Sequence, residues 1–156
     1  MATSVMWFRR DLRLADNPAL VEAIRAADDV VPLFVFDPRL WDPAGPSRRC
    51  YLSASLRALS DRIGGLVVRC GDPVEMVAAL AREVDAQSVH VAADFGPYGA
   101  ERDVAVEAAL AETEVALVRT GSPYAVAPGR VLNKTGDSYQ VFTPFSKAWR
   151  EHGWRA

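Results

Sequence analysis

Four short segments concentrate the side chains that could bind or transform a ligand. Each follows a short apolar run and holds charged or aromatic residues or a tight turn; the segments are Arg9–Asp11, Asp37–Trp41, Gly71–Asp72 and Asp94–Tyr98. Carboxylates and guanidinium groups bind the polar edge or the anionic part of a small molecule, and aromatic rings contact its flat faces. The residue types therefore favour the binding of a flat heteroaromatic ligand.

Each candidate side chain also has a structural interpretation. We favour a structural role for Asp11 and Arg13, as internal salt bridges that fix their loop onto the following helix. For Arg9, a structural role and a ligand-binding role are equally open. We favour a ligand-binding role for Asp37. Asp94 could bind a ligand, or it could accept hydrogen bonds inside its own loop, which is rich in Gly and Pro.

Several reaction classes lack support in the sequence. The only cysteines, Cys50 and Cys70, form no CxxC pair, and no set of Cys, His, Asp and Glu has the spacing of a zinc site. We expect Cys50 to be a small buried thiol and His90, inside an apolar run, to be a hydrogen-bonded strand residue. There is no GxSxG elbow, no GxGxxG fingerprint and no P-loop motif. We therefore predict no catalytic residue and no metal site.

The composition is that of an ordinary globular protein. The 156 residues carry 18 Lys and Arg against 20 Asp and Glu, a formal net charge of −2. This balance argues against a basic nucleic-acid-binding arm and against a polybasic membrane anchor. No apolar run has transmembrane length, and the first residues place apolar side chains before arginines, the reverse of a signal peptide. We expect a cytoplasmic protein with no direct contact to nucleic acid or membrane.

Apolar strands and amphipathic helices alternate along most of the chain. Short apolar runs predict five strands, at Ser4–Phe8, Val30–Phe36, Leu66–Arg69, Ser88–Ala92 and Glu114–Thr120. Helices are expected between them, beginning at Asn17–Pro18, Ser47, Asp72–Pro73 and Gly99. The alternation predicts an α/β fold, a Rossmann-like five-stranded parallel sheet with helices on both faces and strand order 3-2-1-4-5. Ligands of such sheets bind beyond the carboxyl ends of the strands, where the four segments lie.

The pattern changes after Thr120. The residues that follow contain several Pro and Gly turns, and they predict short strands only at Arg130–Leu132 and Tyr139–Phe142. The last residues could begin a helix. We expect one domain over residues 1–130 and a C-terminal extension over residues 131–156.

Four longer motifs stand out along the chain. They are WFRRDLRLADNPAL at Trp7–Leu20, LFVFDP at Leu33–Pro38, DFGPYGAERD at Asp94–Asp103 and VFTPFSKAW at Val141–Trp149. In sequence and order these motifs resemble the photolyase/cryptochrome family. The resemblance implies the N-terminal α/β domain of such a protein, which holds a light-harvesting antenna chromophore. Residues 131–156 would then start the linker to a helical domain, absent from this sequence, that holds FAD, repairs cyclobutane pyrimidine dimers and contacts UV-damaged DNA.

The resemblance also implies a ligand and the residues around it. Members of the family that bind methenyltetrahydrofolate carry an Asn-Glu pair where this sequence has Tyr98–Gly99. The sequence is more similar to members that bind 8-hydroxy-5-deazaflavin or FMN. The chromophore site of the family maps onto Arg9, Phe36, Asp37, Arg48, Leu52, Asp94, Phe95 and Tyr98.

Two other functions stay open at this point. The chain could belong to a cryptochrome-like photoreceptor that signals instead of repairing DNA, because the residues that distinguish the two lie outside this sequence. It could also be a free-standing nucleotide- or flavin-binding α/β module, which the absent glycine-rich loop and the VFTPFSKAW segment disfavour. In the family interpretation Trp149 and Trp154 lack part of their packing partners, which predicts disorder or self-association at this end.

Overall fold

The structure is a computed structural model that describes residues 1–153. It contains two compact units, Met1–Gly121 and a second one from Ser122 onward. The first unit ends where the regular alternation of strands and helices stops, whereas the sequence analysis extended the domain to residue 130. Within residues 1–153, no helix is both long and apolar enough to cross a membrane.

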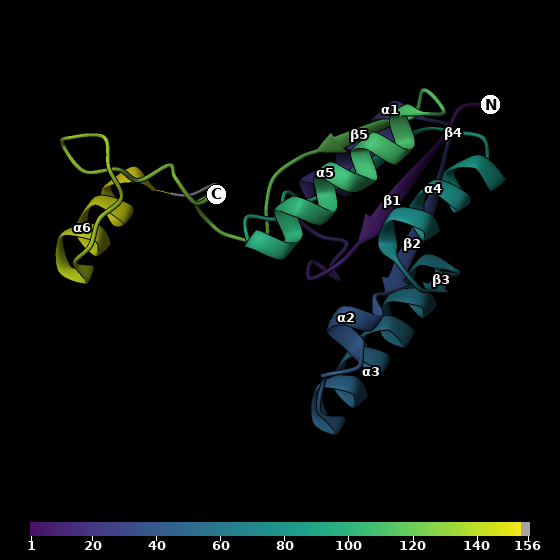
Figure 1. Cartoon of the computed structure of the whole chain (residues 1–156), viewed down its shortest axis with the longest axis horizontal. Coiled ribbons are helices and arrows are strands. Elements are labelled where there is room, and N and C mark those ends of the chain that lie inside the picture. The colour runs from purple at the N-terminus through teal and green to yellow at the C-terminus, as the bar shows by residue number, and fades with distance from the viewer. Residues whose placement is uncertain (154–156) are drawn as a thin grey trace. The chain divides into compact units, whose positions relative to one another are not determined.

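Five parallel strands form one sheet in the first unit (Figure 1). They are β1 (Thr3–Phe8), β2 (Asp29–Phe36), β3 (Val67–Cys70), β4 (Ala86–Val91) and β5 (Ala116–Arg119). Their order is β3-β2-β1-β4-β5, which confirms the predicted topology. The central strand β1 pairs with β2 on one side and with β4 on the other. The strand order therefore reverses between β1 and β4, the position where such sheets bind ligands.

Five helices connect the strands and precede the second unit. They are α1 (Pro18–Ala26), α2 (Pro38–Trp41), α3 (Pro46–Ile63), α4 (Pro73–Glu83) and α5 (Pro97–Ala111). All five begin with a proline, whose fixed φ and missing N–H group suit the first position of a helix. The starts of α1 and α4 are as predicted, and α3 and α5 begin one and two residues earlier than expected.

Side-chain caps explain where α1 and α4 begin. The Asn17 side chain accepts a hydrogen bond from the Leu20 amide at 3.3 Å, and the Asp72 carboxylate accepts one from the Val74 amide at 2.9 Å. Both caps satisfy backbone donors that the first turn of a helix leaves free. Gly64 ends α3 with a φ of +78°, a conformation that favours glycine.

The short helix α2 was not predicted. The sequence analysis treated Asp37–Trp41 as a loop, because four residues are too few to show helical periodicity. Asp37 caps this helix by accepting a hydrogen bond from the Arg39 amide at 2.9 Å. A residue singled out as a ligand contact therefore also has a structural role.

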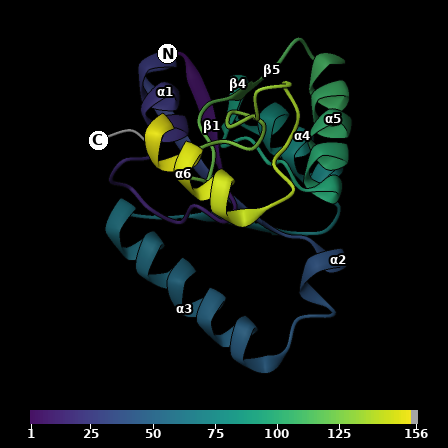
Figure 2. The same cartoon turned by 90° about the vertical axis from the view of Figure 1, so that its left-hand side faces the viewer.

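Alternate side chains of β1 enter two separate hydrophobic clusters. Val5 and Trp7 pack with residues of α4 and α5, whereas Met6 and Phe8 pack with residues of α1 and α3. In Figure 2, α1 lies on one side of β1, and α4 and α5 lie on the other. The two clusters confirm that helices cover both faces of the sheet.

The second unit differs from the prediction. Neither Arg130–Leu132 nor Tyr139–Phe142 forms a strand; the pairing is limited to a single antiparallel bridge between Leu132 and Ser138. Phe142 instead begins α6 (Phe142–His152), the helix that the last residues were expected to start. Apolar residues favour strands in this segment, but the described part of the unit offers no sheet that they could join. Trp149 is half-buried, and Trp154 lies outside the described residues.

Candidate functional site

A cavity of about 740 Å³ opens at the carboxyl ends of β1, β2 and β4. Residues from α2, α3 and the start of α5 complete its walls. Its size is that of an ordinary small-molecule pocket, which holds about 300–1,000 Å³. It lies at the reversal of strand order, where the sequence analysis expected a ligand.

Most of the predicted site residues meet at this cavity. The seven that line it are Arg9, Phe36, Asp37, Arg48, Leu52, Asp94 and Tyr98. The eighth, Phe95, is in the same loop as Asp94, but it is 44 % exposed and is not part of the cavity wall. The structure thus brings together residues that lie up to 89 positions apart, between Arg9 and Tyr98 (98 − 9 = 89).

Aromatic rings form one wall of the cavity. The ring of Phe36 lies edge-on to Phe34, with centroids 5.1 Å apart, and edge-on to Trp41, with centroids 4.6 Å apart. Phe34 and Phe36 are two residues apart on β2 and therefore face the same side of the sheet. Leu52 of α3 adds an apolar side chain to the same lining. This wall offers the apolar contact that a flat ring system needs.

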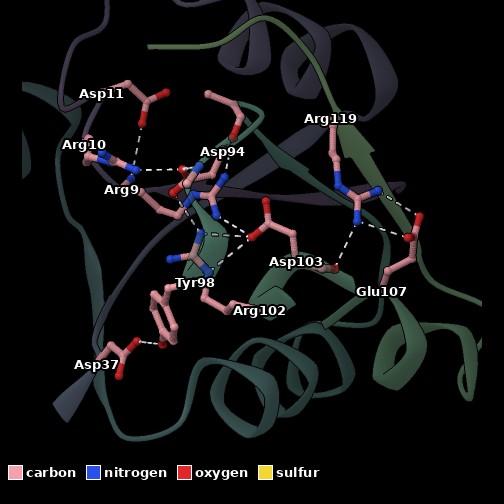
Figure 3. Close-up of polar contacts among 12 residues, drawn as sticks. Arg9, Arg10, Asp11, Asp37, Asp94, Tyr98, Arg102, Asp103, Glu107 and Arg119 are labelled. Atoms are coloured by element: carbon pink, nitrogen blue, oxygen red, sulfur yellow. Dashed lines mark hydrogen bonds and ion pairs between the residues drawn. The ribbon is translucent and has the colours of Figure 1, made fainter. Parts of the chain in front are cut away.

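A hydrogen bond between Tyr98 and Asp37 joins the first turn of α5 to the cap of α2 (Figure 3). The Tyr98 hydroxyl donates to Oδ2 of Asp37, while Oδ1 accepts from the Arg39 amide. Burial, together with the neighbouring Asp37 carboxylate, raises the pKa of Tyr98 to about 12. The tyrosine therefore keeps its proton at neutral pH and holds the two helix starts together.

Buried ion pairs form another part of the lining (Figure 3). Asp103 accepts hydrogen bonds from Arg9 at 2.5 Å and from Arg102 at 2.9 Å. Arg9 also donates to the carbonyl oxygen of Ala92. Burial raises the pKa of the Asp103 carboxyl, and the charge of Arg9 opposes that shift. Both guanidinium groups are therefore committed to contacts within the protein.

The Asp94 carboxylate is held mainly by ion pairs and a hydrogen bond within the protein. Its carboxylate contacts Arg10 at 2.7 Å and Arg102 at 3.4 Å, and it accepts a hydrogen bond from the Gly96 amide at 3.1 Å. Burial by itself would raise the pKa of Asp94, but the hydrogen bonds from Arg10 and Gly96, together with the charges of Arg10 and Arg9, outweigh it and lower the pKa. The structural interpretation of this residue is confirmed, and its position in the cavity wall keeps a ligand contact open.

Gly99 is required by the position of Asp94. A Cβ atom at residue 99 would collide with the Asp94 carboxylate. The glycine in the PYG sequence thus lets α5 begin directly against this acidic side chain. The loop geometry and the ion pairs of Asp94 depend on each other.

The first loop is held by hydrogen bonds. One oxygen of Asp11 accepts from the Arg9 amide at 3.2 Å, and the Arg13 side chain donates to the carbonyl oxygen of Asp16 at 3.0 Å. These contacts confirm structural roles for Asp11 and Arg13, although through backbone groups instead of salt bridges. The pairing of Arg9 with Asp103 confirms its structural role, and because Arg9 also lines the cavity, its ligand-binding role stays a prediction.

Several lining residues were missed by the sequence analysis. Tyr51 and Ser55 lie three and seven residues after Arg48, so helical spacing from Arg48 and Leu52 could have indicated them. Arg102 lies on α5 and Trp7 on β1, and no local pattern indicates that either faces the cavity. Cys50, expected to be buried, is exposed, because its position on α3 faces away from the sheet.

The described residues hold no candidate metal centre. No group of three or more His, Cys, Asp or Glu side chains within residues 1–153 is arranged to hold a metal ion. His90 is a buried strand residue, as expected, with its Nε2 atom 2.9 Å from the Ser88 hydroxyl. The site is therefore defined by its cavity, its aromatic wall and its arginine–carboxylate pairs.

The chain belongs to the DNA photolyase family, whose sequence profile matches residues 4–156. It is 39 % identical to the deoxyribodipyrimidine photo-lyase of Streptomyces griseus over 99 % of this chain and 36 % of that protein. It is 34 % identical to a cryptochrome DASH of Natronomonas pharaonis over 94 % of this chain and 33 % of that protein. The chain thus spans about a third of the length of these relatives.

A solved structure has the same fold. The photolyase of Sulfolobus tokodaii, solved with two FAD molecules and described as implying a novel light-harvesting cofactor, matches 98 % of this chain with a TM-score of 0.82. The match covers 36 % of that chain, and the identity is 24 %. At this level of identity, the similarity establishes the fold.

Proposed function

We propose that this chain is the antenna-binding domain of a DNA photolyase and that it holds a flat tricyclic chromophore in the cavity. FMN and 8-hydroxy-5-deazaflavin are the favoured ligands. When bound, such a chromophore absorbs near-ultraviolet or blue light and passes the excitation to another flavin. The observation that carries the proposal is the cavity of about 740 Å³ on which seven of the eight expected residues converge.

The residues around the cavity fit such a ligand. Phe36 and Leu52 offer apolar contact to a ring system, and the Asp37–Tyr98 pair offers a carboxylate and a phenol to its polar edge. Arg48 is exposed in the first turn of α3 and lines the cavity, where it could contact a ribityl or phosphate tail. The Sulfolobus tokodaii photolyase with two FAD molecules supports a flavin as the ligand class.

A folate antenna fits the segment between β4 and the start of α5 less well. The Asn-Glu pair of folate-binding members would place a glutamate at position 99. A Cβ atom at that position would collide with the Asp94 carboxylate, which Arg10 and Arg102 hold in place. The loop would have to change shape to carry that pair.

The activity of the whole protein is part of the proposal. Because the relatives are about three times longer than this chain, we propose that a further domain holds FAD, contacts UV-damaged DNA and repairs cyclobutane pyrimidine dimers. The domain described here would contribute no catalytic residue. We also propose a cytoplasmic location, which the two exposed free thiols, Cys50 and Cys70, support because such thiols suit a reducing compartment.

A cryptochrome-like photoreceptor is the second candidate. It is favoured by the 34 % identity to a protein named cryptochrome DASH. Both candidates use the same domain, so ligand binding does not separate them. A test of light-dependent repair of a dimer-containing oligonucleotide by the full-length protein separates the two candidates, since a signalling protein would leave the dimers intact.

Titration with FMN and with 8-hydroxy-5-deazaflavin tests the antenna assignment. Asp37→Ala removes a charged hydrogen-bond partner at the cavity, and Leu52→Trp fills part of its volume; each should weaken binding about tenfold or more. Arg69→Gln is the matched control, because the Arg69–Glu83 ion pair lies outside the cavity lining. If the unmodified chain binds neither compound, nor a folate, at high micromolar concentration, the antenna assignment is wrong.

A further inference from the structure

Three aromatic rings that line the cavity carry guanidinium groups over their faces. Over Trp7, the Cζ atoms of Arg9 and Arg102 lie 4.8 Å and 5.1 Å from the ring centroid. Over Trp41, the Cζ atom of Arg49 lies 5.1 Å from the centroid. Over Tyr98, the Cζ atoms of Arg102 and Arg39 lie at 5.6 Å and 5.9 Å. Trp and Tyr are the side chains most easily oxidised by loss of one electron. The cations thus lie over Trp7, Trp41 and Tyr98, three of the four Trp and Tyr rings in the cavity wall.

The arginine–ring contacts are concentrated at one place in the described residues. Five such contacts involve rings of this one cavity. The phenylalanines of the same wall, Phe34 and Phe36, contact other rings edge-on instead.

Trp7 is the most completely covered of the three rings. It is 2 % exposed, lines the cavity, and has both Arg9 and Arg102 within about 5 Å of its centroid. Asp103 holds both guanidinium groups, and Arg9 is further fixed by the carbonyl oxygen of Ala92. These two arginines are therefore anchored against the indole, and a ligand could not recruit either one without breaking a buried ion pair.

An oxidisable ring beside an antenna chromophore is a hazard for light harvesting. An excited flavin or deazaflavin can accept one electron from an indole, which becomes a radical cation while the chromophore becomes reduced by one electron. The electron then returns, both partners regain their ground states, and the excitation is lost as heat. No net chemistry occurs, but the excitation is no longer available for transfer.

Positive charge on the indole face opposes the first of these steps. A unit charge about 5 Å away in a water-poor site interacts strongly with a second positive charge that forms on the ring. The carboxylates of Asp103 and Asp94 lie close to the same guanidinium groups and largely cancel their charge at longer distances. The electrostatic effect is therefore greatest on the ring in direct contact.

We propose that Arg9 and Arg102 protect the excited antenna chromophore by making Trp7 harder to oxidise. This inference rests on the proposed antenna function and adds a role for residues that need not touch the ligand. They act through Trp7 and are positioning residues for light harvesting. Arg49 over Trp41 has the same arrangement, since its side chain is fixed by the carbonyl oxygens of Trp41 and Asp42.

The fluorescence lifetime of bound FMN, or of bound 8-hydroxy-5-deazaflavin, tests this role in the 156-residue chain. Arg102→Gln should shorten the lifetime about twofold or more, because it removes a charge from the face of Trp7. After this change Asp103 still forms its ion pair with Arg9, and Asp94 still forms its ion pair with Arg10. Neither carboxylate is therefore left without a cationic partner. Arg9→Gln is the second variant, in case Arg102→Gln lowers the content of folded protein measured by circular dichroism.

A Trp7→Phe background identifies the ring responsible. In that background, adding Arg102→Gln should not change the fluorescence lifetime, so the double variant and Trp7→Phe alone should have the same lifetime. Arg69→Gln, which breaks an ion pair outside the cavity lining, serves as the control for loss of an arginine. An unchanged lifetime in both arginine variants, or shortening that persists without Trp7, would overturn this inference alone. Failure of the unmodified chain to bind either chromophore would overturn the antenna function and this inference with it.

Discussion

The two units of the chain are stabilised in different ways. The first is built on buried side chains: Leu33 of β2 and Val89 of β4, on the two strands that flank β1, are 0 % exposed. In the second, α6 has no buried residue, and Phe142 and Val141 at its start are 77 % and 61 % exposed. The comparison indicates that packing determines the first unit, while local hydrogen bonds and turns determine the described part of the second.

A loop of the second unit illustrates the local kind of order. The side chain of Asn133 accepts hydrogen bonds from the amides of Thr135 and Asp137, both at 2.9 Å. Such contacts fix a turn without burying apolar surface. Conformation there depends on a few neighbouring residues, whereas strands of the first unit depend on partners far away in the sequence.

Truncation of a core side chain should have the largest effect. Leu33→Ala leaves a cavity in the main hydrophobic cluster and should lower the free energy of unfolding by about 2–5 kcal/mol. Phe145→Ala in α6 removes a side chain that is 36 % exposed and should cost less than about 1 kcal/mol. Denaturant unfolding followed by circular dichroism measures both. Similar losses in the two variants would contradict the contrast between the units.

Helix caps give a smaller contrast. Asn17→Ala removes the side-chain cap of α1 and should cost about 0.5–2 kcal/mol. In α6 the cap position is Val141, which has no capping side chain, so Val141→Asn should instead increase the helix content of the second unit slightly. Chemical denaturation measures the first change and far-ultraviolet circular dichroism the second. A stabilising Asn17→Ala, or a loss of helix with Val141→Asn, would show that tertiary contacts override these caps.

The smallest expected effect is a pH dependence from the core of the first unit. Burial lowers the pKa of His90 below the ordinary histidine value of 6.5, and the charge of Glu22 partly opposes the shift. The unfolded chain therefore binds a proton more readily than the folded one. Stability from this residue is present above pH 6.5 and declines as the pH falls from there toward the lowered pKa. Thermal unfolding should show this decline, and His90→Gln should reduce it; an identical pH profile in the variant would contradict the assignment.

Sequence reasoning predicted the first unit well for a physical reason. Each strand is a short run of mainly apolar residues between two helical patterns, so all five strands were located to within two residues at each end. Proline after a capping residue located the starts of α1 and α4. The predicted strands after residue 130 failed because local preference for a strand has no effect without a neighbouring strand.

The candidate site was predictable in part. Residues at strand ends, such as Arg9 and Asp94, were found because parallel topology brings those ends together. Residues on helix faces, such as Tyr51 and Arg102, were missed because the side of a helix that faces the cavity depends on tertiary packing. The capping role of Asp37 was missed although Asp37–Pro38 has the same signature as Asp72–Pro73. Its bond to Tyr98 could not be predicted, because that contact appears only in the folded chain.

The double use of Asp37 links a backbone amide to events in the cavity. One oxygen of its carboxylate holds the Arg39 amide and the other holds the Tyr98 hydroxyl. A ligand that draws this carboxylate toward itself loosens the first turn of α2, and one that leaves it in place does not. The rate of hydrogen–deuterium exchange at the Arg39 amide should therefore report whether a bound ligand contacts the Asp37 carboxylate.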